Sequence, residues 1–169
     1  FRKAVKEANE DAVILAEHYG NPSAWLKGQE WDSIMNYDAF MEPVSWFLTG
    51  MEKHSDRAEP EKFGDGELFF NTMRYNMAKL PENALDAAMN QLSNHDHSRF
   101  LTRTNRRAGR MKDGFDDAGI GIDYGLFRLA SMLLFTWPGA PTLFYGDEVG
   151  VYGWTEPDCR RPYPWGKED

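Results

Sequence analysis

The sequence has little cysteine, no long apolar run and no excess of positive charge. Its one cysteine, Cys159, excludes an intramolecular disulfide and a zinc site built from several cysteines. The longest apolar stretch, residues 129–137, is far shorter than the roughly 20 residues that a membrane-spanning helix needs. Lys and Arg total 19 against 27 Asp and Glu, and the formal net charge is -8. We therefore expect neither a nucleic acid nor a membrane as partner, and a cytoplasmic, reducing location is favoured.

The composition is that of a core-forming globular protein, with 41% apolar and 14% aromatic residues. The chain opens at Phe1 without Met or a signal-peptide pattern. Its first residues have the pattern of the middle of a helix. It stops just after a proline-rich loop. We therefore expect residues 1–169 to be a single fragment of a larger domain.

Apolar runs and helical periodicity alternate along the chain. Residues 12–16 form a continuous apolar run, which predicts a parallel strand covered on both faces. The further strands are predicted at residues 32–37, 88–93 and 141–145. The helices are predicted at residues 23–27 after the Asn21 cap, from about Pro43 onward, at 68–80, and at 126–135 after the Asp123 cap. The last helix is apolar on most faces and is expected to be buried, whereas residues 53–66 and 101–121 are expected to be solvated or irregular loops.

Strands that alternate with helices predict an α/β fold with a parallel sheet. Each predicted strand ends in polar residues, and the carboxyl ends of parallel strands are where such folds place ligand chemistry. About four β/α units correspond to half of an eight-stranded (β/α) barrel. The strand-end clusters are Glu17-His18, Asn36-Tyr37, Asn94-His95-Asp96 and Gly146-Asp147-Glu148.

Several of these segments resemble signatures of the α-amylase family of glycoside hydrolases. The segment SNHDHSRF at residues 93–100 resembles the family's strand-7 region, and LAEHY at residues 15–19 resembles its strand-5 region. The segments DSIMNY at residues 32–37 and PGAPTLFYGDEVG at residues 138–150 are similar to strands 6 and 8. The segment DCRRP at residues 158–162 is similar to the loop after strand 8 in neopullulanase, cyclomaltodextrinase and oligoglucosidase-like members.

The resemblance implies a partial TIM-type (β/α)8 barrel that holds strands 5–8, without the N-terminal half barrel and the C-terminal β-domain. It implies that Glu17 is the general acid/base and that Asp96 stabilises the transition state. The substrate-binding residues that it implies are His95, His18, Tyr19 and Asn94. The whole protein is then expected to be a retaining hydrolase of α-glucosidic bonds in starch-type glucans or maltooligosaccharides.

The family's nucleophile lies on strand 4, and no segment of this sequence matches that region. We therefore expect the fragment alone to be inactive. The resemblance implies no required cofactor, and a structural calcium ion is allowed but not indicated. Two open sheet edges predict self-association of the half barrel. The choice among α-1,4 hydrolysis, α-1,6 hydrolysis and transglycosylation stays open.

Plainer alternatives accompany each assignment. Glu17 could be an exposed residue at a strand end, and Asn94-His95-Asp96 could be a turn that satisfies its own backbone. A metal site at His95, Asp96 and His97 would instead indicate a different, metal-dependent barrel enzyme. A non-catalytic amylase-like scaffold is a further alternative.

Four side chains carry separate expectations. Trp25 and Trp154 either stack on sugar or, as we favour, pack within the protein. Arg99 is expected to pair with a carboxylate, and Asp147 is expected to belong to a capped turn rather than a cation site.

Overall fold

The chain folds into short parallel strands with a layer of helices against one side of them. The structure is a computed structural model and describes residues 1–110 and 116–168. The helices are α1 (Arg2–Ala8), α2 (Glu42–Thr49), α3 (Gly66–Met77), α4 (Glu82–Asp86), α5 (Phe100–Arg103) and α6 (Tyr124–Thr136). The strands are β1 (Leu15–Ala16), β2 (Ser33–Ile34), β3 (Met89–Gln91) and β4 (Ala140–Thr142). The remaining elements are the π-helix η1 (Tyr37–Met41) and the 3-10 turns η3 (Asp116–Gly119), η4 (Asp147–Val149) and η5 (Asp158–Arg160).

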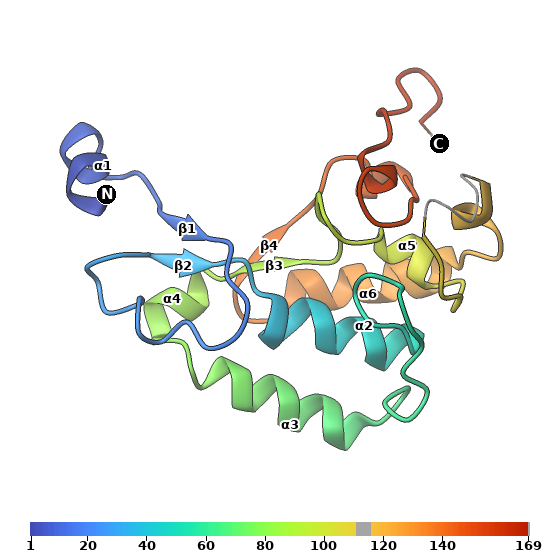
Figure 1. Ribbon diagram of the computed structural model, residues 1–169, viewed down its shortest axis with the longest axis horizontal. Helices are drawn as coiled ribbons and strands as arrows, with labels where there is room; N and C mark the ends of the chain where they lie inside the picture. The colour runs from blue at the N-terminus through green and yellow to red at the C-terminus, as the bar shows by residue number, and fades with distance from the viewer. Residues whose placement is uncertain (111–115, 169) are drawn as a thin grey trace.

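The strands pair in chain order and in parallel, as the sequence predicts. Leu15 of β1 is in register with Ser33 of β2, and Met89 of β3 with Ala140 of β4. A parallel bridge between Met35 and Met89 joins the two pairs. Polar residues that follow β1, β2 and β3 are therefore brought to one edge of the strand array (Figure 1).

The β1 region differs from the sequence prediction. Residues 12–16 were expected to be covered on both faces, but Val13 is 69% exposed and Leu15 is 40% exposed. The predicted helix at residues 23–27 is a set of turns. The Asn21 side chain accepts from the Ser23 amide, which satisfies the backbone within a turn rather than starting a helix. Because β1 and β2 are joined by turns, four complete β/α units are not confirmed.

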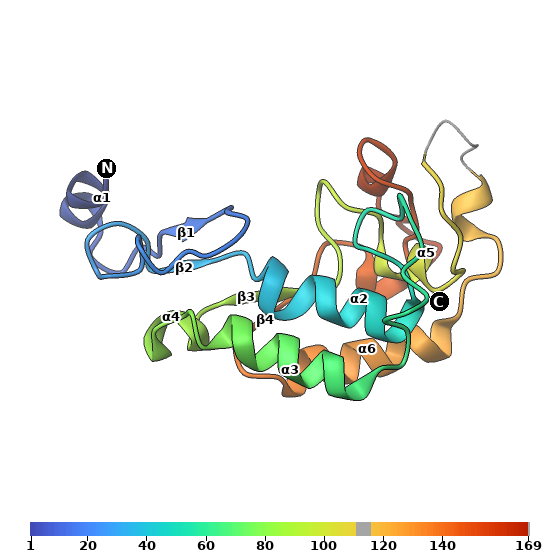
Figure 2. The ribbon, with the colours of Figure 1, turned by 60° about the horizontal axis from the view of Figure 1, so that its bottom comes forward.

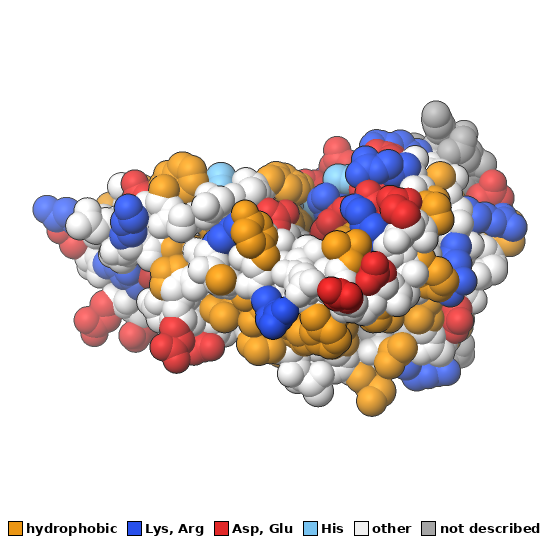
Figure 3. All heavy atoms as spheres, turned by 90° about the horizontal axis from the view of Figure 1, so that it is seen from below, with side chains coloured by type: hydrophobic (Ala, Val, Ile, Leu, Met, Phe, Trp, Pro, Cys, Tyr) orange, Lys and Arg blue, Asp and Glu red, His pale blue; other side chains and the backbone are white. Residues whose placement is uncertain are grey.

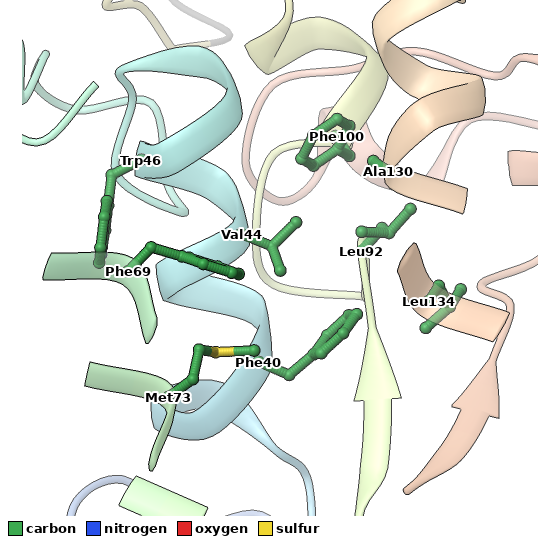
Figure 4. Packing of buried hydrophobic residues seen from close by; sticks show 9 residues of the cluster. All are labelled: Phe40, Val44, Trp46, Phe69, Met73, Leu92, Phe100, Ala130 and Leu134. Carbon is green, nitrogen blue, oxygen red and sulfur yellow. The ribbon is translucent and has the colours of Figure 1, made fainter. Parts of the chain in front are cut away.

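The main core lies between the helices and β3. Val44 of α2 lies between Phe69 of α3 and Leu92, which follows β3, and Phe100 and Leu134 close the far side (Figure 4). The helices α2, α3 and α6 form the layer against the strands (Figures 1 and 2). This layer supports the ends of β2 and β3, where the polar residues gather.

Local signals account for most helix boundaries. Asp123 accepts from the Leu126 amide at 3.0 Å, so the predicted cap of α6 is confirmed. Asp65 caps α3 in the same way, through the Leu68 amide at 2.9 Å. The α2 helix ends at Gly50, whose φ of +72° is a left-handed conformation that glycine adopts readily.

The prediction that α6 is buried on most of its faces is wrong. Ala130 and Leu134 are fully buried, but Leu129, Met132 and Phe135 are 51%, 67% and 59% exposed. Elements of the described chain cover only one side of this helix. Hydrophobic side chains also reach the surface in the view from below (Figure 3). No helix in the described part of the chain has both the length and the apolar character needed to cross a membrane.

The segment at residues 53–66 is less solvated than predicted. Ser55 is fully buried and Glu59 is only 4% exposed. Glu59 accepts from Arg57 and Lys62, which pair its charge at the edge of the core. Of the irregular region predicted at residues 101–121, the first residues belong to α5, residues 116–119 form η3, and residues 111–115 lie outside the described residues.

Candidate active site

Side chains that follow β1 and β3 converge on one place. A carboxylate oxygen of Glu17, a ring nitrogen of His95 and a carboxylate oxygen of Asp96 all lie within 4.8 Å of one another. Their side chains are 40%, 45% and 37% exposed, so the group is open to solvent. Glu17 follows β1 and Asp96 follows β3, and the parallel pairing through β2 brings both to the same edge.

Glu17 is held by a residue of the intervening strand end. The Tyr37 hydroxyl donates to Glu17 Oε1 at 2.8 Å. The Tyr37 ring is 1% exposed and stacks on Tyr19 with ring centroids 4.6 Å apart. Burial, together with the bond to Glu17, raises the pKa of the Tyr37 hydroxyl above its usual value, so Tyr37 remains a proton donor at neutral pH. The second Glu17 oxygen, Oε2, lies 3.8 Å from His95 Nε2.

Asp96 lies between a histidine and an arginine. His95 Nε2 is 3.4 Å from Asp96 Oδ1, and Arg160 Nη2 is 3.6 Å from the same oxygen. The Arg160 Nε also donates to the His95 carbonyl at 2.9 Å, and its guanidinium pairs with Glu156. The loop that contains η5 thus places a positive charge beside the Asp96 carboxylate.

A buried layer lies beneath these residues. Asn94 is 3% exposed, and its Oδ1 accepts from the amides of Asp96 and His97 and from His97 Nδ1. Its Nδ2 donates to the Tyr37 hydroxyl at 3.0 Å. Burial and the neighbouring His54 lower the pKa of His97 to about 2, so its ring is neutral. Substrate binding by Asn94 stays a prediction, since both ends of its amide are used within the chain.

The remaining predicted site residues are more scattered. Tyr19 is 50% exposed beside Tyr37, next to the carboxylates. His18 instead packs against Trp25 and Trp31, with ring centroids 4.8 and 5.3 Å away. Trp154 is 2% exposed and packs within the protein, as we favoured.

Arg99 has the structural role expected for it. Its guanidinium pairs with Asp147 at 3.0 Å, and the side chains are 0% and 3% exposed. It also donates to the carbonyls of Cys159 and Tyr145. Arg99 therefore ties the loop after β3 to the two segments that follow β4.

The spacing of Glu17, His95 and Asp96 is short enough to hold a cation, although the Arg160 guanidinium opposes one there. The alternative trio of His95, Asp96 and His97 is not formed, because the His97 ring is fully buried and its Nδ1 is bonded to Asn94.

A comparison of the whole chain with known protein families agrees with the sequence motifs. The family model described as the α-amylase catalytic domain matches residues 1–167. The chain belongs to the α-amylase family. This membership confirms the resemblance and replaces the alternative of a metal-dependent barrel enzyme from another family.

The relatives within this family are glycoside hydrolases. The chain is 37% identical over 169 residues to neopullulanase 2 of Thermoactinomyces vulgaris, covering 100% of this chain and 24% of that protein. It is 32% identical over 165 residues to a cyclomaltodextrinase of a Bacillus species, covering 98% of this chain and 25% of that protein. The chain spans about a quarter of the length of these relatives.

Solved structures of the family share the fold. The cyclic α-maltosyl-(1→6)-maltose hydrolase of Arthrobacter globiformis in its ligand-free form matches with a TM-score of 0.72 and 30% identity. The match covers 99% of this chain and 32% of that structure. A solved cyclomaltodextrinase matches with a TM-score of 0.73 and 32% identity, over 98% of this chain and 24% of its own. The chain is therefore a part of an α-amylase-type barrel with parallel strands.

Sequence reasoning assigned Tyr37 and Arg160 no role at the site, and it offered His97 only as a ligand of the alternative metal site. Tyr37 stands at a predicted strand end, and that position was the available signal. Arg160 lies in the segment DCRRP, which is similar to the family's loop after strand 8, but no local pattern connects it with Asp96.

Proposed function

We propose that this chain supplies the acid/base side of the active site of a retaining glycoside hydrolase. The proposed substrates are α-glucosidic bonds of starch-type glucans and maltooligosaccharides. The observation that carries the proposal is the approach of the Glu17 and Asp96 carboxylates, together with His95, at one edge of parallel strands. Family membership and the names of the relatives support the substrate class.

In the proposed reaction, Glu17 gives its proton to the glycosidic oxygen as the bond from that oxygen to the anomeric carbon breaks. The bonding electrons stay on the departing oxygen, and a carboxylate nucleophile forms a bond to the anomeric carbon. Glu17 then takes a proton from the water that displaces this nucleophile. A retaining enzyme needs the nucleophile about 5–5.5 Å from the acid. We propose that it comes from a segment outside these 169 residues.

The neighbours of Glu17 receive supporting roles in this proposal. The Asp96 carboxylate stabilises positive charge that develops on the sugar ring in the transition state. His95, which lies between the two carboxylates, donates to a sugar hydroxyl. Tyr19 and His18 line the leaving-group side, and Asn94 contributes to the binding of substrate. These groups carry out the chemistry without a cofactor.

The test compares the 169-residue chain with a full-length protein in which it is joined to the remainder of the barrel. We expect maltotriose cleavage by the full-length protein and none by the chain alone. Glu17→Gln should lower kcat/KM by about 10²–10⁴-fold, as for loss of a general acid. Glu67→Gln, an exposed carboxylate on α3, is the matched control. Binding of maltotriose without cleavage by the full-length protein would instead identify a non-catalytic scaffold.

We also propose that the isolated chain self-associates. The support is the exposure of Leu15 on β1 and of Leu129, Met132 and Phe135 on α6. Large exposed apolar side chains and unpaired strand edges favour association with other chains. Light scattering at high micromolar concentration should give a mass above that of one chain, and a monodisperse monomer would reject this proposal.

A further inference from the structure

The direction of each hydrogen bond beneath the site follows from Asn94. Two backbone amides, those of Asp96 and His97, point at one end of the Asn94 side chain at 3.0 and 2.9 Å. A backbone N–H can only donate, so this end must be the oxygen. The other end, Nδ2, is therefore the donor that faces the Tyr37 hydroxyl at 3.0 Å.

The Tyr37 hydroxyl has one proton to donate. Its neighbours that can accept are Glu17 Oε1 at 2.8 Å, Met35 Sδ at 3.6 Å and the hydroxyl of the stacked Tyr19. A carboxylate oxygen is a much stronger acceptor than a thioether sulfur or a phenol oxygen. With Asn94 donating to the hydroxyl oxygen, the hydroxyl proton points at Glu17 Oε1.

The Tyr37 ring has little freedom to move. It stacks on Tyr19, and its centroid lies 5.0 Å from that of the buried His97 ring. Its backbone begins η1, directly after the strand end that lies between β1 and β3. A hydroxyl on a ring held in this way fixes the orientation of the carboxylate to which it donates.

We propose that Tyr37 is a positioning residue that orients Glu17, so that the transferable proton is carried on Oε2. Oε1 is occupied as the acceptor of the Tyr37 bond, and Oε2 faces His95. Asn94 connects this arrangement with the second carboxylate, because it also accepts from the Asp96 amide. This inference rests on the proposed function, since it concerns the same acid/base residue.

The test uses two substrates that differ in their need for an acid. Maltotriose has a sugar leaving group that requires a proton, whereas α-maltosyl fluoride releases fluoride, which leaves without one. In the full-length protein, Tyr37→Phe removes only the hydroxyl and keeps the stacked ring. We expect kcat/KM for maltotriose to fall about 10–100-fold, the size of one charge-assisted hydrogen bond. kcat/KM for the fluoride should stay within about twofold. The control, Tyr75→Phe at a 69% exposed position of α3, should change neither value.

A double-mutant cycle with Glu17→Gln separates positioning from a structural effect. If Tyr37 acts through Glu17, adding Tyr37→Phe to Glu17→Gln should change kcat/KM for maltotriose by less than about twofold. An equal fall for both substrates, a further loss in the double variant, or no effect of Tyr37→Phe would overturn the inference. If the unaltered full-length protein cleaves neither substrate, the proposed function itself is rejected, and this inference with it.

Discussion

Glu52 offers a sharp test of how buried hydrogen bonds stabilise the segment after α2. Glu52 is 4% exposed, and one of its carboxylate oxygens accepts from the Asp56 amide at 2.6 Å. The other oxygen accepts from the His54 amide at 3.0 Å and from His54 Nδ1 at 3.1 Å. Burial opposes ionisation, but these bonds outweigh it and lower the pKa of Glu52 from 4.5 to about 2.

The lowered pKa of Glu52 sets both the size and the pH dependence of its contribution to the unfolding free energy. At about 1.36 kcal/mol for each pH unit, a fall from 4.5 to about 2 corresponds to about 3 kcal/mol. The His54 side chain is 33% exposed, and screening by solvent reduces the figure to about 2 kcal/mol. The folded-state pKa is the lower one, so this stabilisation is complete above pH 4.5 and is lost as the pH falls toward 2.

The experiment is urea unfolding of the 169-residue chain and its Glu52→Gln variant between pH 7 and pH 2.5. We expect the variant to lose about 2 kcal/mol of unfolding free energy at pH 7 and much less at pH 2.5. Glu61→Gln, an exposed position in the same loop, is the control and should change little. An equal loss at both pH values would show that the charge is not responsible, and no loss at pH 7 would refute the reasoning altogether.

Three further predictions concern buried side chains in the loops that follow β3 and β4. Burial lowers the pKa of His97 from 6.5 to about 2, so the unfolded chain binds a proton at this histidine that the folded chain does not, and the unfolding free energy should fall as the pH drops below 6.5. Replacing this residue, His97→Asn, should flatten that decline in urea titrations between pH 6.5 and 5. Arg99→Ala leaves Asp147 buried without its partner and should cost about 3–5 kcal/mol in thermal or urea unfolding, partly recovered in Arg99→Ala/Asp147→Ala. Burial also raises the pKa of the Cys159 thiol to about 11, so a thiol reagent at pH 8 should label it only on unfolding, and rapid labelling of the folded chain would contradict its burial.

Local sequence signals were sufficient for several elements. The Asp123 cap and the apolar periodicity after it predict α6, and the run at residues 88–93 contains β3. The order of strands and their parallel pairing also follow, because alternating strand and helix patterns favour one topology. That topology predicts from the sequence alone that Glu17 and Asp96, which follow two of the parallel strands, lie at one edge.

Burial and long-range partners required the tertiary structure. The same apolar pattern is compatible with a covered or an open face, and the exposure of Val13 and Met132 depends on which elements lie over them. The bond from Asn94 to Tyr37 spans 57 positions in the sequence, and the approach of Arg160 to Asp96 likewise joins distant segments. Periodicity describes a residue and its near neighbours along the chain, whereas such contacts arise only when separate segments pack together. The amino-acid pattern thus specified the acids and the strands that carry them, and folding in three dimensions selected the side chains that hold them in place.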